Sequence, residues 1–471
     1  MKRHIRLEAE VLQKEESLWR DKIAQALSFL EAVQSQANNQ SLEDAQSLVN
    51  KTLETLAQAE EYVQMLAPDT ANLSDKMGIE SKEDPSVLTA KEINAKASAL
   101  YAKIQVTGIP IDTQALQDLI NKNKQQLDEM LKDLQGKFGF LPNPNKADHY
   151  AQIAEKAGYP LPKSPTGKTK TDVWTIERAA KDVPALVELS NARKVRMKLS
   201  KLESLSKSVK DGKVYPTYSL DEELGRTHAG GDANPMNWEP DMQGLVKDGD
   251  NTILVVDYER MEPKVLATLS ADKQFQADLK ADPYTELAKT IFNTQQISPE
   301  QRSVAKVAML ASIYGQEDRV LAARLGVSVY QAARIQAAWH KRYPQAFNFL
   351  QQLKQSGRAT GQAVSYHGRV KALNKPDPEA NDRLAVNSVM QNTAGDLARI
   401  GFANVASDPR VDQLGVKIIT TVHDSMILSI PKGVDVEEVK TIVKQDMVDG
   451  NDSNFGLSIS FKQGSAWGTA R

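Results

Sequence analysis

The chain has 471 residues and a mass of 52.0 kDa, a length typical of about three domains. Its hydrophobic and charged fractions, 41% and 25%, are those of a globular protein, and the lack of cysteine excludes disulfides and thiolate metal sites. The net charge of −2 argues against a nucleic-acid partner. That charge is unevenly spread, because residues 1–100 hold 11 basic and 17 acidic residues and the remainder holds 48 and 44.

Neither export nor membrane insertion is expected from the sequence. The N-terminus, MKRHIRLEAE, is charged and lacks the apolar core of a signal peptide. No apolar run approaches the ~18–20 residues that a membrane-spanning helix needs. We therefore expect a cytoplasmic protein with no membrane partner.

The first 136 residues are expected to be mostly helical. Apolar residues recur at helical spacing over residues 5–33 and 42–66, which predicts an antiparallel pair of long amphipathic helices. A polar linker follows at 67–88, and a helix restarts at Thr89, where Thr89 and Glu92 have capping-box spacing. Residues 108–116 predict a turn and a second helix start, followed by a charged helix.

The next part of the chain combines loops with a strongly basic run. Residues 140–173 are rich in Pro, Lys and Gly, which predicts loops around short helices. Residues 189–213 hold eight Lys/Arg against two acids. Taken alone, such a run is a solvated helix face or a phosphate-binding surface, and both interpretations stay open at this point.

Three β-branched, apolar runs predict strands, at residues 252–257, 416–422 and 426–430. Between the first and second lie about 150 mostly helical residues. The fold class is therefore α+β, with a sheet built from distant segments. Asp257 and Asp424 each end a predicted strand. A lone strand-ending Asp usually starts a turn, but two converging carboxylates suit Mg²⁺, which needs few protein ligands besides substrate phosphates.

A second candidate site lies in residues 301–315, QRSVAKVAMLASIYG. Arg302, Lys306, Leu310 and Tyr314 recur four residues apart, so they line one face of a single helix. The two cations suit the phosphates of a nucleoside triphosphate, and the apolar and aromatic side chains suit its base and sugar. A solvated cationic face beside core residues is the alternative.

These motifs resemble those of polymerase-I-like (family A) DNA polymerases. Residues 257–262, DYERME, are similar to the first palm motif, D-Y-S-Q-I-E, and residues 422–424, VHD, to the third, V-H-D-E. The stripe at 302–315 looks like the fingers-helix motif. Further similarities run in the same order along residues 93–471. They are KTKT at 168–171, GR at 225–226 with N-x-M-N at 234–237, RLAVNSVMQNTAGDL at 383–397, and WGTAR at 467–471.

The resemblance implies a right-hand architecture with an antiparallel-sheet palm, helical fingers and thumb, and a helical N-terminal extension. The implied divisions are 1–92 for the extension, 93–215 for the thumb with a lead-in segment of the palm, 216–271 for the first part of the palm, 272–368 for the fingers, and 369–471 for the second part of the palm. The basic run then becomes a phosphate-binding thumb helix.

The implied activity is template-directed addition of dNTPs to a primer 3′-OH, with two Mg²⁺ ions for which Mn²⁺ is a substitute. Asp257, Asp424 and the Tyr258 carbonyl would bind the ions, and Glu262 would crowd a ribose 2′-hydroxyl. The remaining nucleotide contacts implied are Arg302, Lys306 (which would also protonate pyrophosphate), Leu310, Tyr314 and Tyr284. The implied primer–template contacts are Arg226, Asn234, Asn237, Arg383, Asn387, Gln391 and His423, with Arg193, Arg196, Lys198 and Lys201 from the basic run.

Some positions depart from the family pattern. Leu310 stands where Phe or Tyr is usual, Ala311 replaces Gly, Met236 replaces Gln, and Tyr284 replaces His. Ser425 replaces the Glu that follows the catalytic Asp, so that acidic group is absent. No departure removes a metal ligand, so we expect activity to survive and fidelity to differ.

Residues 1–92 show neither the D-x-E motif nor the α/β pattern of a proofreading exonuclease. We expect a compact, exonuclease-lacking, monomeric replicase of a phage or other mobile element, in a bacterial host, whose N-terminal helices brace the fold or dock a replication partner. A single-subunit RNA polymerase or primase-like polymerase is the alternative enzyme. A catalytically degenerate DNA-binding scaffold is the alternative outside catalysis, although such a scaffold would be free to lose Asp257, Asp424, Arg302 and Lys306.

Overall fold

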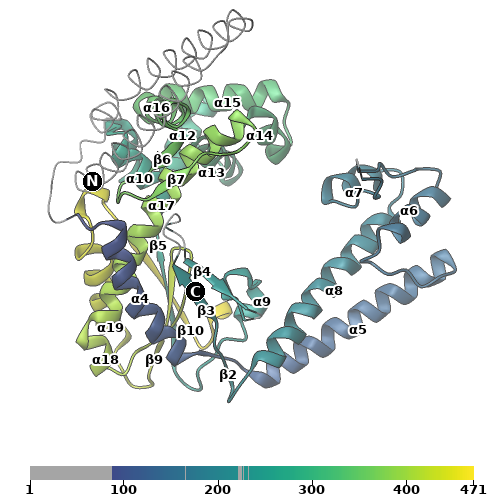
Figure 1. Ribbon diagram of the computed structural model, residues 1–471, viewed down its shortest axis with the longest axis horizontal. Helices are drawn as coiled ribbons and strands as arrows, with labels where there is room; N and C mark the ends of the chain where they lie inside the picture. The colour runs from purple at the N-terminus through teal and green to yellow at the C-terminus, as the bar shows by residue number, and fades with distance from the viewer. Residues whose placement is uncertain (1–86, 165, 221–224, 226, 232, 471) are drawn as a thin grey trace, which may run out of the picture.

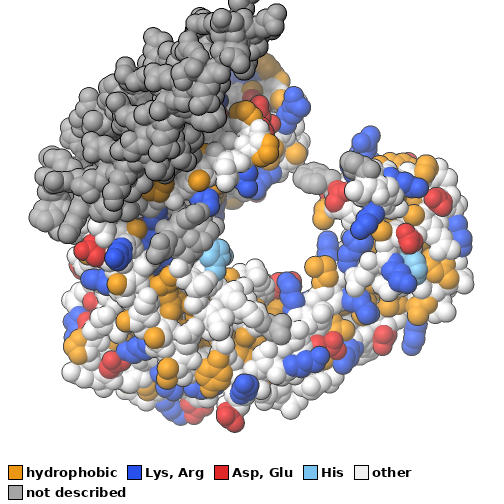
Figure 2. All heavy atoms as spheres, in the orientation of Figure 1, with side chains coloured by type: hydrophobic (Ala, Val, Ile, Leu, Met, Phe, Trp, Pro, Cys, Tyr) orange, Lys and Arg blue, Asp and Glu red, His pale blue; other side chains and the backbone are white. Residues whose placement is uncertain are grey.

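The computed structural model describes residues 87–470 except 165, 221–224, 226 and 232. The two helices predicted within residues 1–66, and most of the linker after them, lie outside these described residues. Figure 1 shows a sheet lobe, a helical lobe above it and a long helical arm to one side. Figure 2 shows an open cleft between the helical lobe and the arm. None of the described helices combines the length and apolar character that crossing a bilayer requires.

The sheet lobe is built on four antiparallel strands in the order β10-β5-β9-β8. They are β5 (Thr252–Tyr258), β8 (Lys417–Val422), β9 (Ser425–Ile430) and β10 (Ile459–Gly464). The three strands predicted from apolar runs are confirmed, and so is a sheet made from distant segments. The edge strand β10 was missed because its side chains are half-buried or exposed and include Lys and Gln.

The central strand β5 is buried over most of its length because both of its faces are covered. Leu254 and Val256 point into one core with the helix α17 (Pro378–Ser407), and Ile253 and Val255 point into a second core, which the sheet shares with the arm. Asp257 follows Ile253 and Val255 in this alternation, so it belongs to the face opposite α17.

The helical excursion between β5 and β8 forms the helical lobe and ends in α17, whose thirty residues are mostly buried. Its helices are α10 (Met261–Leu269), α11 (Lys273–Leu279), α12 (Pro283–Phe292), α13 (Pro299–Ile313), α14 (Asp318–Leu325), α15 (Val329–Arg342) and α16 (Pro344–Thr360). Two short strands follow, β6 (Gln362–Val364) and β7 (Val370–Ala372). Gly401 lets α17 approach β5, since a Cβ there would overlap the Tyr258 hydroxyl.

The helix α4 (Ala90–Thr107) opens the described chain and packs on α17 and β8. Its predicted start is confirmed, because Thr89 and Glu92 form the capping box. The implied division between residues 92 and 93 falls inside this helix. Two ribbons and a helical turn join α4 to the remaining sheet lobe: β1 (Ile109–Pro110), β2 (Lys213–Val214), β3 (Thr217–Leu220), β4 (Thr227–Gly230) and η1 (Pro235–Asn237).

The arm consists of two long helices that pack along each other and two short ones at the far end (Figure 1). They are α5 (Thr113–Phe138), α6 (Ala147–Lys156), α7 (Val173–Ala179) and α8 (Ala185–Ser208). The predicted charged helix corresponds to α5, and the basic run falls mainly on α8. The remaining short elements flank the sheet: α9 (Pro240–Gln243), α18 (Pro409–Gln413), α19 (Val436–Lys444), a π-helical turn η2 (Gln445–Asp449), η3 (Ser453–Phe455) and η4 (Trp467–Thr469).

The π-helical turn supports a prediction about pH. Burial and the neighbouring Asp408 carboxylate raise the pKa of Asp446 from 3.8 to about 6. A carboxyl group whose pKa is higher in the folded chain holds its proton more tightly when folded. Its contribution to stability is therefore lost as the pH rises from 3.8 to about 6. Asp446→Asn is expected to raise the free energy of unfolding by ~1 kcal/mol at pH 8 and by less at pH 5. Urea unfolding at both pH values measures this; an equal gain at both would contradict it.

Candidate nucleotidyl-transfer site

The backbone brings the two predicted carboxylates to the same edge of the sheet. Asp257 in β5 is the register partner of Ser425 in β9, and Asp424 directly precedes Ser425. The Tyr258 N–H donates to the Asp424 carbonyl over 3.1 Å. Asp424 therefore lies in the turn between β8 and β9 rather than at the end of a strand beside β5, but the two carboxylates converge as predicted.

The turn that carries Asp424 has an unusual backbone. His423 has a φ of 55°, in the left-handed region that non-glycine residues seldom occupy. The turn joins Val422 to Ser425, which pair with each other. This conformation lets β9 fold back beside β8, and the Asp424 carbonyl is held next to Tyr258 while the His423 side chain stays exposed.

Ser425, where the family pattern has Glu, interacts with the first carboxylate. Its hydroxyl donates a hydrogen bond to Asp257 Oδ1. A donated hydrogen bond restricts the rotation of a carboxylate. The substitution thus supplies a neutral group that orients Asp257, which the sequence alone did not suggest.

The donor set fits a hard divalent cation. Within residues 87–470 that the structure describes, no three acidic or histidine side chains are grouped as a metal site. Asp257, Asp424 and nearby carbonyl oxygens would supply only part of a coordination shell. Mg²⁺ tolerates such a partial shell, because it is usually held by one or two carboxylates and completed by substrate phosphates and water.

Of the predicted stripe, Arg302, Lys306 and Leu310 lie on one helix, α13, and Tyr314 is the C-cap residue of that helix. Its start is fixed by Pro299 and by a capping box between Ser298 and Gln301. Ala305, Met309 and Ser312 are buried on the inner side of the helix. The predicted stripe is accessible, with Arg302 and Lys306 exposed and Leu310 and Tyr314 half-buried.

Arg302 and Lys306 stand over the ring of Tyr284. The guanidinium carbon of Arg302 is 5.3 Å from the ring centroid and the ammonium of Lys306 is 5.9 Å from it. Arg302 also donates to both carboxylate oxygens of Asp282, over 2.6 and 3.0 Å. Although burial alone would raise it, hydrogen bonds from Arg302 and Thr285 hold the pKa of Asp282 below its ordinary value. The structure therefore groups three of the predicted nucleotide contacts.

Glu262 and Tyr314 link two motifs that are distant in sequence. Glu262 lies in the first turn of α10, and the Tyr314 hydroxyl donates to its Oε1 over 2.9 Å. Both side chains are half-buried. The Glu262 carboxylate is thereby fixed at the junction between α10 and the end of α13.

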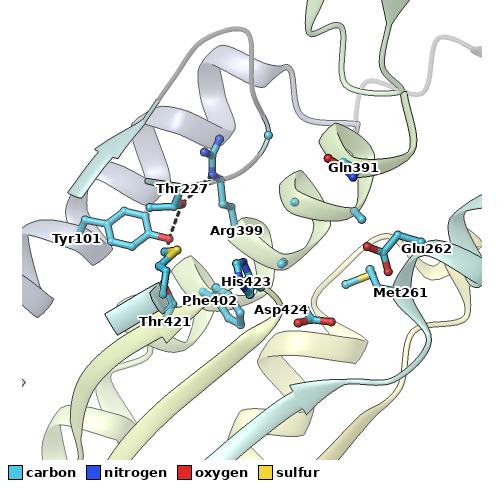
Figure 3. A pocket seen from close by; sticks show the side chains of 15 residues that line it. Tyr101, Thr227, Met261, Glu262, Gln391, Arg399, Phe402, Thr421, His423 and Asp424 are labelled. Carbon is cyan, nitrogen blue, oxygen red and sulfur yellow. Dashed lines mark hydrogen bonds between the residues drawn. The ribbon is translucent and has the colours of Figure 1, made fainter. Parts of the chain in front are cut away.

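A pocket of about 250 Å³ joins Glu262 to Asp424 (Figure 3). Gln391 and His423, both predicted DNA contacts, line it as well. Its remaining lining residues are Tyr101, Gly225, Thr227, Met236, Met261, Ala394, Gly395, Ala398, Arg399, Phe402 and Thr421.

Tyr101, Thr227 and Arg399 form a polar wall that sequence reasoning missed. The Tyr101 hydroxyl is 2.7 Å from Thr227 Oγ1 and 3.2 Å from Thr421 Oγ1, and Arg399 Nε donates to Thr227 Oγ1 over 3.3 Å. Burial raises the pKa of Tyr101, so the phenol stays protonated. A signal was present for Arg399, the single Lys or Arg in the second half of α17.

The other predicted DNA contacts of the sheet lobe are spread along α17 and η1. Arg383 pairs with Glu317 at 3.0 Å, and the side-chain oxygen of Asn387 is buried with no hydrogen-bond partner among the described residues. Asn234 caps η1 by accepting the Met236 N–H, and Asn237 is exposed. Arg226 lies outside the described residues.

Three of the four cations predicted on α8 have intramolecular partners. Arg193 donates to the carbonyls of Pro144 and Thr171 and stacks on Tyr150. Lys198 pairs with Asp241, and Lys201 approaches Glu239 at 3.9 Å. Arg196 is exposed. Arg193 acts as a structural link between loops, so a DNA contact through these four residues stays a prediction whose best candidate is Arg196.

Known proteins are similar to this chain over the residues that carry these motifs. Residues 242–469 match the sequence model described as DNA polymerase family A. DNA polymerase I of Lactococcus lactis subsp. cremoris is 25% identical over 429 residues, covering 85% of this chain and 48% of the relative. Thermostable DNA polymerase I of Thermus filiformis is 24% identical over 403 residues, covering 80% and 48%. The chain thus spans about half the length of these curated relatives.

The fold also resembles a solved structure, described as the POL domain of Pol1 from M. smegmatis in complex with DNA primer-template and dNTP. The TM-score is 0.73 at 20% identity, and the match covers 94% of this chain and 79% of that one. At that identity the likeness concerns the fold. The family match covers β5, α13, α17 and the β8–β9 turn, so residues 242–469 are assigned to DNA polymerase family A.

Proposed function

We propose that this protein is a template-directed DNA polymerase that adds dNTPs to a primer 3′-OH. The observation that carries the proposal is the pocket that Asp424 and Glu262 line together. Asp257 lies beside Asp424 at the edge of the sheet, and the Tyr314 hydroxyl donates a hydrogen bond to Glu262. Carboxylates for divalent ions, a cationic stripe for phosphates and a neighbouring polar pocket are the parts that nucleotidyl transfer needs.

The structural units then take the roles of a right hand. The sheet lobe corresponds to the palm, the helical lobe from α11 to α16 to the fingers, and the arm from α5 to α8 to the thumb. Primer–template DNA would occupy the cleft between them (Figure 2). The proposed divisions follow those implied by the sequence, except that α4 packs with the palm.

Asp257 and Asp424, with the Tyr258 carbonyl, would hold two Mg²⁺ ions. Bound there, the ions supply activation of the primer hydroxyl and stabilisation of the leaving oxygen. Arg302 and Lys306 would bind the triphosphate, and the Lys306 ammonium would protonate the departing pyrophosphate. Arg302 uses two of its five N–H donors on Asp282, so three stay available for phosphate.

Primer extension with dNTPs or NTPs tests the proposal directly. The full chain with Mg²⁺ and a primer–template is expected to extend the primer with dNTPs and to lose activity on adding a chelator. Efficient use of NTPs without a primer would instead support the RNA polymerase alternative. If neither dNTPs nor NTPs support synthesis, the result would favour the DNA-binding scaffold without catalysis.

Glu262→Ala is expected to raise ribonucleotide incorporation. The carboxylate is fixed by Tyr314 at the position proposed to crowd a 2′-hydroxyl, and removing it opens space there. We expect the ratio of dNTP to NTP incorporation to fall by at least about tenfold, which is ~1.4 kcal/mol of discrimination. Single-nucleotide incorporation kinetics measure that ratio. Tyr314→Phe is the matched control, because it removes the hydrogen bond to Glu262 and keeps the Glu262 carboxylate in the chain. An unchanged ratio of dNTP to NTP incorporation in Glu262→Ala would count against a role of Glu262 in excluding the 2′-hydroxyl.

A further inference from the structure

Asp282 holds the guanidinium group of Arg302 by its edge. Arg302 donates from Nε to Asp282 Oδ2 over 2.6 Å and from a terminal nitrogen to Oδ1 over 3.0 Å. A two-point pair of this kind fixes the plane of a guanidinium group as well as its position. Asp282 Oδ2 also accepts the Thr285 N–H over 3.1 Å and so caps α12, which packs beside α13. Arg302 is therefore tied to the start of the neighbouring helix.

The ring of Tyr284 supports the same guanidinium group from its face. The guanidinium carbon of Arg302 lies 5.3 Å from the ring centroid. Tyr284 is only 6% exposed, so its ring offers little surface to a nucleotide. The Arg302 side chain, by contrast, is 44% exposed. Tyr284 is thus placed to act through Arg302 rather than by touching the nucleotide itself.

Arg260 ties the segment that carries Asp282 to the end of β5. It follows Tyr258 by two residues, and its φ of 55° turns the chain from β5 into α10. Its guanidinium group donates to the Ala281 carbonyl over 2.8 Å and lies 3.7 Å from Asp282 Oδ1. The family motif has Gln at this position, which carries no charge to attract a carboxylate. The Asp282 carboxylate of this chain therefore lies between two arginines, one at the end of β5 and one on α13.

We propose that Asp282 positions Arg302 for the triphosphate of the incoming nucleotide, and that Arg260 holds Asp282 in place. The inference rests on the proposed polymerase function and deepens it. Asp282 takes two of the five N–H donors of Arg302, so the other three are held in a fixed plane for the phosphates. A cation that is already fixed loses less conformational freedom when the triphosphate binds. Asp282 is in this sense a positioning residue, because it acts through Arg302.

The variant Asp282→Asn tests the proposal in the full chain with Mg²⁺ and a primer–template. Asparagine still accepts the Thr285 N–H as a helix cap, but it has no charge and sets an NH₂ group against Arg302. We expect the KM for the dNTP to rise about tenfold and kcat to stay within about threefold, the pattern of lost uniform binding. Equilibrium binding of a fluorescent dATP to the chain, followed by anisotropy, should weaken by a similar factor.

A double-mutant cycle separates this role from a purely structural one. Arg302→Ala removes the group that Asp282 positions, so adding Asp282→Asn to it should change KM by less than about twofold. A weakened helix cap would act equally in both backgrounds. Arg260→Gln should raise KM by about threefold in the wild-type chain and have little effect in Asp282→Asn.

Asp435→Asn is the matched control. Asp435 is an exposed aspartate that caps α19 by accepting the Glu437 N–H over 2.9 Å. The variant therefore removes the charge of a helix-capping aspartate that has no place in the proposed site. It should leave KM, kcat and the affinity for the fluorescent dATP as they are in the wild-type chain.

Three results would overturn the proposal. An unchanged KM in Asp282→Asn would exclude a positioning role. A lower KM would mean that the carboxylate competes with the phosphates for Arg302. Equal effects of Asp282→Asn with and without Arg302 would reduce Asp282 to a helix cap. A wild-type chain that extends no primer would instead count against the polymerase function, and binding of the fluorescent dATP would then report the inference by itself.

Discussion

Asp424→Asn is expected to abolish nucleotide addition, lowering its rate by about a thousandfold or more. Asparagine keeps the shape of the side chain but removes the charge that, with Asp257, would hold the divalent ions at the edge of the sheet. Primer–template affinity is expected to stay within a few-fold, because DNA affinity comes mainly from cations that contact phosphates. Rapid-quench primer extension and anisotropy on the same preparation measure the two quantities.

Asp250→Asn is the matched control for this experiment. Asp250 is 80% exposed and pairs with Lys432 at 3.1 Å, beyond the end of the sheet where Thr252 pairs with Ile430. It should retain full synthesis and full DNA affinity. Retained synthesis in Asp424→Asn would refute the metal assignment, and loss of DNA binding in parallel would show that Asp424 supports the fold instead.

The carboxylates and the α13 stripe could be predicted because their signals are local. Asp257 and Asp424 follow β-branched apolar runs that form buried strands, and a period of four places Arg302 through Tyr314 on one helix face. Local patterns of this kind survive without knowledge of tertiary packing. The pairing of Asp257 in β5 with Ser425 in β9 joins residues 168 apart, and only the fold shows it.

The polar wall of the pocket could not be predicted, because its bonds join residues far apart in sequence. Tyr101 meets Thr227 across 126 residues and Thr421 across 320. The partners of the basic run were missed for the same reason, since Lys198 meets Asp241 only when α8 returns to the sheet lobe. Composition identifies a cation, but only the fold decides whether an acid or a phosphate neutralises it.

The second large effect concerns stability, at a buried ionic cluster beside the pocket. Arg369 donates from Nε and from a terminal nitrogen to Asp396 over 2.6–2.9 Å, and Arg399 lies 3.8 Å from the same carboxylate. Their side chains are at most 2% exposed. Both arginines also donate to Asn94 Oδ1, so the cluster ties α4 to α17 and to the start of β7.

Asp396→Ala is expected to lower the free energy of unfolding by ~3–5 kcal/mol, because it leaves two buried guanidinium groups without the carboxylate that faces both. His367, 3.7 Å from Asp396, cannot replace the carboxylate, because an imidazole is neutral or cationic and burial lowers its pKa. Urea unfolding followed by tryptophan fluorescence measures the loss. Asp250→Ala, which breaks an exposed pair, should cost less than ~1 kcal/mol.

A double variant separates charge from packing at this cluster. Arg369→Met/Asp396→Leu removes a buried charge pair and fills its volume with apolar atoms, a change that is often neutral or stabilising for buried pairs. It is therefore expected to recover much of the stability that Asp396→Ala loses, although Arg399 remains. If the double variant were instead as unstable as the single one, the cost would lie in the remaining Arg399 charge and in the hydrogen bond from Arg369 to Asn94 that is lost. Recovery would mean that the isolated charge is what the fold cannot tolerate.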